Sequence, residues 1–285
     1  MHFTKVQGAG NDFILIESGR FKRDWSEMAR VMCARGFGIG GDGLLLLSPS
    51  KVADFRMRIF NADGSEAEMC GNGIRCLARY IFEAGLIGEK VTGLAIETLA
   101  GVKNVELKKT RGKLNLVRVG MGQPEFRADK IPVAIAREES NALDIKIMKY
   151  PVAIDGKTLP LSFVSMGNPH AVYFAEQPVA DFPLSLLGPG IENHAIFPKR
   201  TNFEIARVAS PGLIEVRVWE RGAGETMACG TGACAVAVVA QLLGYTGQQV
   251  DIKLPGGVLT VEWDGAGEVF MSGPAEITFT GEWPE

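Results

Sequence analysis

Two cysteines, Cys70 and Cys229, occupy matching positions in a long internal repeat. Each follows a segment that alternates apolar and polar residues, and each precedes a Gly-x-Gly sequence. The two cysteines are 159 residues apart (229 − 70), and Asn61 and Glu220 keep the same spacing, so the alignment runs without gaps. The sequence therefore predicts a duplicated domain with one thiol in each copy.

The Gly-x-Gly after each cysteine predicts the start of a helix, where unpaired backbone N–H groups and the macrodipole favour an anion. A thiolate is one such anion, because a cysteine at a helix N-terminus can have a pKa lowered to roughly 3.5–7.5. A substrate carboxylate is another, since glycine lets it approach the backbone. Removing the α-proton of an amino acid places charge on its carboxylate, and one oxyanion donor contributes about 2.7–4 kcal/mol. Inversion needs an acid and a base on opposite faces, so two opposed thiols predict two-base proton transfer.

A second repeated pair extends the duplication. Asn11 lies in Gly-Asn-Asp-Phe and Asn168 in Gly-Asn-Pro-His, 157 residues apart (168 − 11). His170 is of interest because its neighbour Asn168 mirrors Asn11. The two halves are expected to share a sizeable interface, with both thiols facing one cleft.

Composition favours a small-molecule enzyme of two domains. A chain of 285 residues with 46% hydrophobic residues is long enough for two cores. A net charge of −3 without clustered cations argues against nucleic acid as a partner. The N-terminus lacks a secretory pattern, and the apolar runs at 44–47 and 233–240 are shorter than the ~18 residues of a membrane span. The prediction is a cytoplasmic protein without membrane contact, whose five cysteines are reduced.

Periodicity predicts an α/β (α+β) fold in which each half is a mixed sheet, or barrel, wrapped around a central helix. The helix after Cys229 is apolar on all sides and must be buried. The predicted domains are 1–122 with 273–285, and 123–272, with a tail strand at 277–280. Helices are predicted at 25–33, 73–84 and 232–243, and strands at 3–7, 13–17, 44–47, 55–60, 94–98, 114–119, 171–174, 214–219, 250–254, 257–263 and 269–272.

Six motifs together resemble the diaminopimelate epimerase family: residues 10–13, 61–66, 69–76, 167–170, 201–203 and 219–234. The motif ending at Cys234 is the most specific, and the set covers both halves. The resemblance implies interconversion of LL- and meso-2,6-diaminopimelate without PLP, metal or other cofactor, in lysine and peptidoglycan-precursor biosynthesis. It also implies two pseudo-symmetric halves and a homodimer.

Residue by residue, the resemblance makes Cys70 and Cys229 an acid and a base that exchange roles with direction. Glu220 and His170 match supporting catalytic residues beside the reacting centre, and Arg221 would form a fork on the distal carboxylate. Gly43 departs from many members, which have a glutamine there, so its contact could only be through the backbone. The implied substrate-binding residues are Asn11, Asn61, Gly71, Asn72, Asn168, Asn202, Glu220, Arg221, Gly230 and Thr231.

The remaining cysteines are expected in the core. At ~100° per residue, Cys76 and Cys234 point away from the first thiol of their helices, and Cys33 is expected to be buried with them. This spacing also disfavours a zinc site. Arg75, one turn into its helix, is interpreted as structural.

Three other functions remain open at this point. The chain could be a different cofactor-independent racemase, for example of proline derivatives. It could be a redox protein in which Cys70 and Cys229 form a reversible disulfide, although no Cys-x-x-Cys is present. A non-catalytic ligand-binding protein is disfavoured because both thiols are retained.

Overall fold

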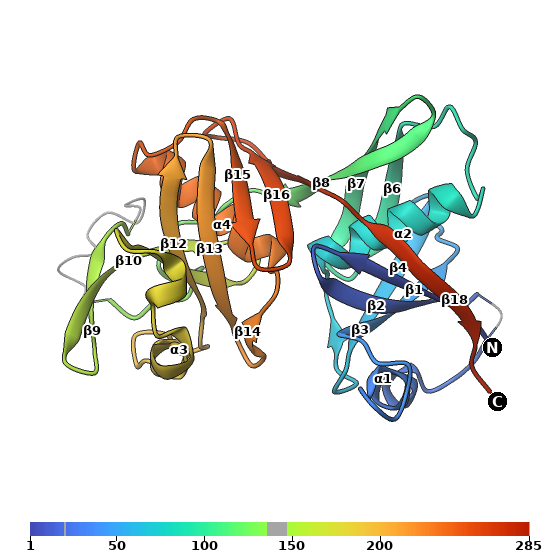
Figure 1. Cartoon of the computed structure of the whole chain (residues 1–285), viewed down its shortest axis with the longest axis horizontal. Helices are drawn as coiled ribbons and strands as arrows, with labels where there is room; N and C mark the ends of the chain where they lie inside the picture. Colours follow the sequence, from blue (N-terminus) through green and yellow to red (C-terminus); the bar gives the residue numbers. More distant parts are fainter. Residues whose placement is uncertain (20, 136–146, 285) are drawn as a thin grey trace. The chain divides into compact units, whose positions relative to one another are not determined.

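The computed structural model describes residues 1–19, 21–135 and 147–284, and divides into two compact units (Figure 1). Unit 1 comprises residues 1–120 and 272–285, and unit 2 comprises residues 121–271. The fold is mixed α/β and strand-dominated, with few helices, as the periodicity predicts. Among the described residues, no helix has the length and apolar character needed to cross a membrane.

In unit 1 each strand pairs with the next in the order β18, β1, β2, β3, β4, β6, β7 and β8, and the short β5 pairs with β4. The tail segment predicted as a strand lies in β18, which runs antiparallel to β1. The strands are β1 (His2–Gly8), β2 (Asn11–Glu17), β3 (Gly43–Ser48), β4 (Phe55–Asn61), β5 (Glu66–Ala67), β6 (Gly93–Thr98), β7 (Gly101–Thr110), β8 (Lys113–Gly122) and β18 (Glu276–Glu282).

In unit 2 the corresponding order is β9, β10, β11, β12, β13, β15 and β16, with β14 paired to β13. The 3-10 turn η1 (Val179–Asp181) and helix α3 (Leu184–Glu192) pack against β13. The strands are β9 (Tyr150–Ile154), β10 (Lys157–Ser165), β11 (Pro169–Phe174), β12 (Asn202–Ser210), β13 (Leu213–Glu220), β14 (Gly224–Thr226), β15 (Gln249–Leu254), β16 (Gly257–Glu262) and β17 (Val269–Gly273).

The two units repeat the same pairing pattern. The strand pairs β2–β3 and β4–β6 are parallel and alternate with antiparallel pairs, and β11–β12 and β13–β15 do the same. Register is also preserved, because Phe13 lies opposite Gly43 in unit 1 and His170 lies opposite Asn202 in unit 2. The repeat detected in the sequence is therefore a repeat of topology.

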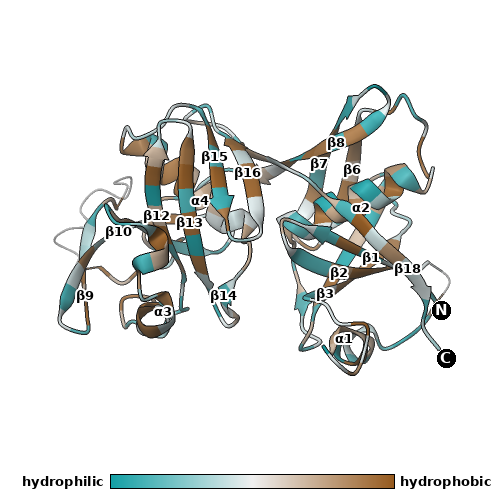
Figure 2. Ribbon diagram, viewed as in Figure 1, coloured by the Kyte–Doolittle hydropathy of each residue, from teal (hydrophilic) through white to brown (hydrophobic). Residues whose placement is uncertain are grey.

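Each sheet packs around one central helix, as predicted. Helix α2 (Gly71–Glu83) contacts β1, β2, β3, β4, β7 and β18, and α4 (Gly230–Leu242) contacts β10, β11, β12, β15 and β16. Residues 233–240 of α4 are all buried, whereas α2 has polar residues on its exposed face (Figure 2). Helix α1 (Trp25–Cys33) packs on β3 and β4, and the Asp24 side chain caps its N-terminus.

Several predicted boundaries are wrong for identifiable reasons. The central helices begin at Gly71 and Gly230, two residues before the predicted starts, because each cysteine is itself the N-cap. The sequence pattern also fails to predict β7, β9, β10, β12 and α3. Strand β7 is rich in lysine, β10 contains Pro160, β12 carries charged residues, and α3 contains Gly-Pro-Gly. Each of these features lowers the local propensity that tertiary packing overrides.

Candidate active site

The two thiols have the same local geometry in the two units. Cys70 caps α2 and its Sγ accepts a hydrogen bond from the N–H of Gly73 at 3.4 Å. Cys229 caps α4 and its Sγ accepts from the N–H of Gly232, also at 3.4 Å. Both cysteines have extended backbones, as N-caps do. Each sulfur therefore lies at the positive end of a helix dipole.

The second glycine of each Gly-x-Gly allows the helix to pack closely on its sheet. A Cβ at Gly73 would come within 3.0 Å of Leu45 Cδ2 on β3, and a Cβ at Gly232 would come within 2.8 Å of Glu204 Oε1 on β12. No larger residue fits these positions without displacing the neighbour. The strand residue that packs against this glycine is therefore apolar in unit 1 (Leu45) and acidic in unit 2 (Glu204).

In unit 1, Asn11, the first residue of β2, lies near the thiol. Its Oδ1 lies 3.9 Å from Cys70 Sγ and accepts a hydrogen bond from Asn72 Nδ2 at 3.3 Å. Its Nδ2 donates to Asp42 Oδ2 at 2.5 Å. Asp42 thereby fixes which end of the Asn11 amide faces Cys70.

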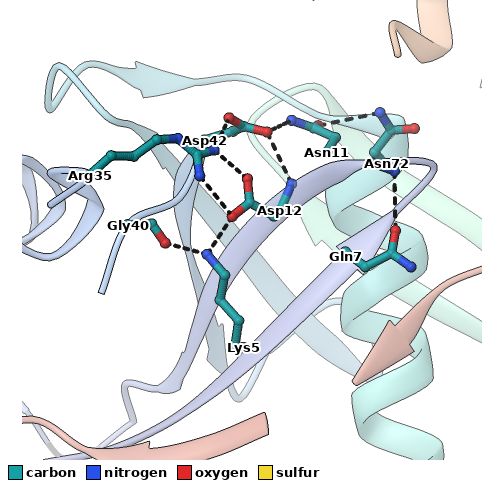
Figure 3. Close-up of polar contacts among 9 residues, drawn as sticks. Lys5, Gln7, Asn11, Asp12, Arg35, Gly40, Asp42 and Asn72 are labelled. Atoms are coloured by element: carbon teal, nitrogen blue, oxygen red, sulfur yellow. Dashed lines mark hydrogen bonds and ion pairs between the residues drawn. The ribbon is translucent and has the colours of Figure 1, made fainter. Parts of the chain in front are cut away.

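Asp42 belongs to a charged cluster next to Asn11 (Figure 3). Arg35 contacts Asp12 at 2.5 Å and Asp42 at 2.8 Å, and Lys5 contacts Asp12 at 2.6 Å and the Gly40 carbonyl. Burial acts to raise the pKa of Asp12, but the hydrogen bonds from Arg35 and Lys5 outweigh it and the pKa is lowered. Asp12 is therefore ionised at neutral pH.

Asn61 lies opposite Gly43 in the β3–β4 pair, and its Nδ2 donates to Ser65 Oγ at 2.9 Å. A side chain at position 43 would meet the Phe60 carbonyl oxygen at 2.7 Å. The close approach of the Phe60 backbone thus favours glycine at position 43.

In unit 2, hydrogen bonds link the thiol to a buried pair of a histidine and a glutamate. Cys229 Sγ lies 3.4 Å from Thr231 Oγ1, which accepts from Asn168 Nδ2 at 3.3 Å. Asn168 Oδ1 lies 2.9 Å from His170 Nε2, and His170 Nδ1 lies 2.7 Å from Glu204 Oε1. The side chains of His170 and Glu204 are fully buried.

Glu220, at the end of β13, adds a further carboxyl beside Cys229. Thr226 Oγ1 donates to Glu220 Oε1 at 2.6 Å. Burial raises the pKa of Glu220, against the opposing effects of the Thr226 hydrogen bond and the charge of His170. Burial also raises the pKa of Cys229 well above its usual value, and the charges of Glu220 and Glu204 add to the effect. Cys229 is therefore a protonated thiol at neutral pH in the unliganded protein.

Asn202 and Arg221 form a third contact in unit 2. Asn202 Nδ2 donates to the Pro169 carbonyl at 2.8 Å, and its Oδ1 accepts from the Arg221 N–H at 3.0 Å. The Arg221 guanidinium lies at an exposed position and donates to the Lys199 carbonyl at 3.3 Å. A single weak contact leaves the guanidinium able to turn toward an anionic ligand.

The predicted residues thus form local groups within their own units. Cys70, Asn11 and Asn72 are in contact in unit 1, with Asn61 at the neighbouring strand end. In unit 2, contacts connect Cys229, Thr231, Asn168 and His170, and separately Asn202 and Arg221. Gly71 and Gly230 are the first residues of their helices, and both are buried.

Sequence reasoning missed Asp42, Glu204 and Thr226. A signal for Glu204 was present, because the 159-residue offset aligns it with Leu45 inside an apolar strand (204 − 45). Asp42 and Thr226 have no repeated counterpart of the same type, so only the contacts reveal them.

The other cysteines are core residues, as predicted. Cys33, Cys76 and Cys234 are buried, and all five cysteines are free thiols. Burial raises the pKa of Cys33 to about 11 and that of Cys76 to about 12. Arg75 is fully buried and donates to the Gly71 carbonyl at 3.2 Å, in agreement with a structural role. Within the described ranges, no three or more His, Cys, Asp or Glu residues cluster so as to hold a metal ion.

The comparison with known families agrees with this arrangement. The family model for diaminopimelate epimerase matches residues 3–127 and 162–278, which include both thiols. The chain is 49% identical to the diaminopimelate epimerase of Pelotomaculum thermopropionicum, across 100% of this chain and 99% of that protein. It is 47% identical to the diaminopimelate epimerase of Desulfovibrio desulfuricans, across 99% and 98%. The chain belongs to the diaminopimelate epimerase family.

Solved structures show that this epimerase fold is shared more widely. A hydroxyproline epimerase from Agrobacterium vitis matches with a TM-score of 0.72 at 15% identity, covering 99% of this chain and 90% of that one. A phenazine biosynthesis protein of the PhzF family from Bacillus anthracis matches with a TM-score of 0.70 at 17% identity, covering 100% and 99%. At these identities the similarity concerns the fold alone. As a member of its family, the chain is an isomerase.

Proposed function

We propose that Cys70 and Cys229 are the two proton-transferring groups with which this epimerase interconverts LL- and meso-2,6-diaminopimelate. One thiolate removes the α-proton, and the other thiol delivers a proton to the opposite face of the same carbon. The roles exchange when the reaction runs in the other direction. No cofactor is required, because the helix-start amides of Gly71, Asn72, Gly230 and Thr231 stabilise the charge on the reacting carboxylate.

One observation carries this proposal: each unit holds a thiol as the N-cap of a Gly-x-Gly helix, with the same 3.4 Å bond from the third helical amide. Structural cysteines do not require this duplicated setting, and the three other cysteines are buried away from it. A pair of equivalent groups is what inversion of a stereocentre requires, since one group cannot reach both faces.

The raised pKa of Cys229 defines its role in the free enzyme. Burial and the nearby carboxylates favour its thiol form, so Cys229 is the acid before substrate binds. When it acts as base, its proton needs an acceptor, and Glu220 is the carboxyl hydrogen-bonded to it. An ionised Glu220 can also pair with the substrate ammonium group.

Amide side chains would hold the substrate. Asn11 and Asn168 lie beside the two thiols, and Asn61 and Asn202 lie at the ends of β4 and β12. Arg221 matches the distal carboxylate in charge and in its planar fork. The residues that bind the unreactive end are thus distinct from those that invert the reacting centre.

The direct test is incubation of reduced protein with LL-diaminopimelate, without added PLP or metal, followed by chiral chromatography. The expected product is the meso isomer. Cys234→Ala, which changes a core thiol of the same helix, should retain activity and controls for general thiol loss. Folded, reduced protein that does not convert LL-diaminopimelate would contradict the proposal.

Two of the alternatives are tested in the same assay. A racemase of proline derivatives would invert L-proline or hydroxyproline and leave diaminopimelate unchanged. A redox protein would be active only as a Cys70–Cys229 disulfide, which mass spectrometry would detect. The proposed epimerase should instead lose activity on oxidation and recover it with dithiothreitol, because the sulfur atoms of a disulfide cannot carry protons.

We further propose that the protein is cytoplasmic and acts as a homodimer, as expected for its biosynthetic family. Cell fractionation tests the first point. Sedimentation equilibrium tests the second, and a mass of 30.7 kDa at assay concentration would contradict it.

A further inference from the structure

The repeat places different pairs of residues at one buried position of the two units. The offsets of 157 and 159 residues align Phe13 with His170 (170 − 13) and Leu45 with Glu204 (204 − 45). Phe13 and Leu45 are 2% and 0% exposed, and His170 and Glu204 are both 0% exposed. Unit 1 therefore has an apolar pair at this position of the fold, whereas unit 2 has a histidine and a glutamate.

The fold does not need the charges of unit 2. A buried ion pair seldom stabilises a protein more than well-packed apolar residues do. Burying Glu204 costs stability, because its Oε2 is buried and has no hydrogen-bond partner among the described residues. Leu45 packs against Gly73 as Glu204 packs against Gly232. A buried unsatisfied oxygen that packing does not require calls for a functional explanation.

Both ring nitrogens of His170 face oxygen atoms that can accept a hydrogen bond. Asn168 Nδ2 donates to Thr231 and its Oδ1 faces His170 Nε2, so a hydrogen bond between Asn168 and His170 in this arrangement uses a proton on Nε2. Glu204 Oε1 faces Nδ1 at 2.7 Å and lies against the first turn of α4, where the helix dipole favours a carboxylate. A carboxylate accepts only, so Nδ1 carries a proton as well.

We propose that Glu204 is a positioning residue for the Cys229 half of the reaction, holding His170 protonated on both nitrogens beside Glu220. The charge of His170 then favours the ionised form of Glu220, which is the carboxyl in contact with Cys229. Through Asn168 and Thr231 the same imidazolium fixes the hydrogen bonds around the thiol. This inference rests on the proposed role of Cys229.

The first test is Glu204→Gln, which keeps the shape and removes the charge. His170 then loses its second proton, and kcat should fall at least about tenfold while KM changes little. His170 and Glu220 face each other. The other titratable groups that face them are Glu204 on β12 and Cys229, the N-cap of α4. In this variant Glu220 loses both the His170 charge, which lowers its pKa, and the Glu204 charge, which raises it. The effect of His170 is the larger, so the pKa of Glu220 should rise. The acidic limb of the kcat/KM profile should therefore move to higher pH.

A spectroscopic readout separates this role from a structural one. The chain has three histidines, so nitrogen NMR of labelled protein can assign His170 by comparison with His170→Phe. Wild type should show two protonated ring nitrogens and Glu204→Gln only one. Glu204→Asp should partly restore both the second proton and kcat. Wild-type kcat and pH profile in Glu204→Gln, or a single ring proton in wild type, would overturn the proposal.

The second test copies unit 1 into unit 2 with His170→Phe and Glu204→Leu together. This variant should fold with at least wild-type thermal stability and have no epimerase activity. Normal activity would overturn the proposal. If the double variant does not fold, Glu204→Gln and the NMR measurement decide the question.

A matched control distinguishes failure of this inference from failure of the proposed function. Glu215→Gln, which removes a part-exposed carboxylate 3.4 Å from Arg207 on the neighbouring strand, should retain wild-type kcat and pH dependence. If wild type is active, Cys229→Ala is inactive and Glu204→Gln is normal, only the role of Glu204 is wrong. If wild type does not convert diaminopimelate, the proposed function itself is wrong.

Discussion

The two thiol sites share one backbone arrangement but differ in what surrounds the sulfur. Cys70 is partly exposed and is approached by Asn11, whose amide is oriented by Asp42 in a cluster that includes the exposed Arg35. Cys229 is buried beside Glu220, and hydrogen bonds through Thr231 and Asn168 connect it to the buried pair of His170 and Glu204. Duplication thus supplied two equivalent positions, and later substitutions gave each its own electrostatics.

The two sites also share several features. Both units keep the N-cap thiol, the Gly-x-Gly and an asparagine beside it. The asparagines present opposite ends, because Oδ1 of Asn11 faces Cys70, whereas Nδ2 of Asn168 donates to the threonine beside Cys229. An acceptor oxygen therefore lies beside the Cys70 sulfur, whereas a hydroxyl lies beside the Cys229 sulfur.

The comparison is tested most severely by removing each thiol in turn. Cys70→Ala and Cys229→Ala should each lower the rate of inversion by at least about 100-fold, because the acid and the base are both essential. Chiral chromatography of the diaminopimelate isomers gives the rate, and circular dichroism confirms folding. If either variant still epimerises at a substantial rate, the two sites are not equivalent partners.

A second prediction concerns the buried pair that differs between the units. Leu45→Glu places a buried carboxylate in unit 1, where the residue aligned with His170 is Phe13. This carboxylate has no histidine to pair with, so the variant should lower the free energy of unfolding by about 3–5 kcal/mol. Urea unfolding measures the effect. Leu45→Met, which conserves volume, should cost less than about 1.5 kcal/mol. Equal stability of the two variants would show that unit 1 tolerates the charge that unit 2 carries.

A third prediction isolates the cluster beside Cys70. Asp42→Asn keeps the size of the side chain but removes the charge that orients Asn11, and should lower kcat/KM by about tenfold, or roughly 1.4 kcal/mol. Its stability should change by less than about 1 kcal/mol, because the ion pair with Arg35 is exposed. Arg56→Ala, which removes a part-exposed pair with Glu97, is the matched control and should retain activity. Unchanged kinetics in Asp42→Asn would mean that Asn11 needs no such support.

The smallest expected effect is a difference in thiol reactivity. The raised pKa of Cys229 predicts slow alkylation by iodoacetamide at pH 7, with a rate that still increases at pH 9 as the thiolate forms. Peptide mass spectrometry measures the modification of Cys229 in Cys70→Ala. Cys33, with a pKa of about 11, provides an internal reference for a buried thiol. Rapid, pH-independent alkylation of Cys229 would contradict its assignment as the resting acid.

The sequence predicted the features that occur in both halves and missed those that occur in only one. The 159-residue offset identified both thiols, their helices and the fold class, because these features occur twice in the same pattern. Helix starts were misplaced because a cysteine N-cap is not among the usual capping residues. Strands such as β10 and β12 were missed because Pro160 and Glu204 interrupt their apolar pattern, and only tertiary packing shows that both fit.

The site residues illustrate the same limit. Asn11 and Asn168 could be proposed as site residues because they mirror each other, and Arg221 only from the family motif. The support given by Asp42 and Glu204 depends on contacts between residues about 30 positions apart (Asn11 to Asp42, His170 to Glu204). No local pattern encodes such contacts.

The most direct test of the central claim is isotopic. Wild-type enzyme is incubated with LL-diaminopimelate in D2O, and the first meso product and the recovered substrate are analysed by chiral chromatography and mass spectrometry. Two thiols acting on opposite faces predict solvent deuterium at the inverted α-carbon of every product molecule, with little deuterium in the recovered substrate. First-formed meso product that keeps the original α-proton would show that one base serves both faces, and would contradict the account.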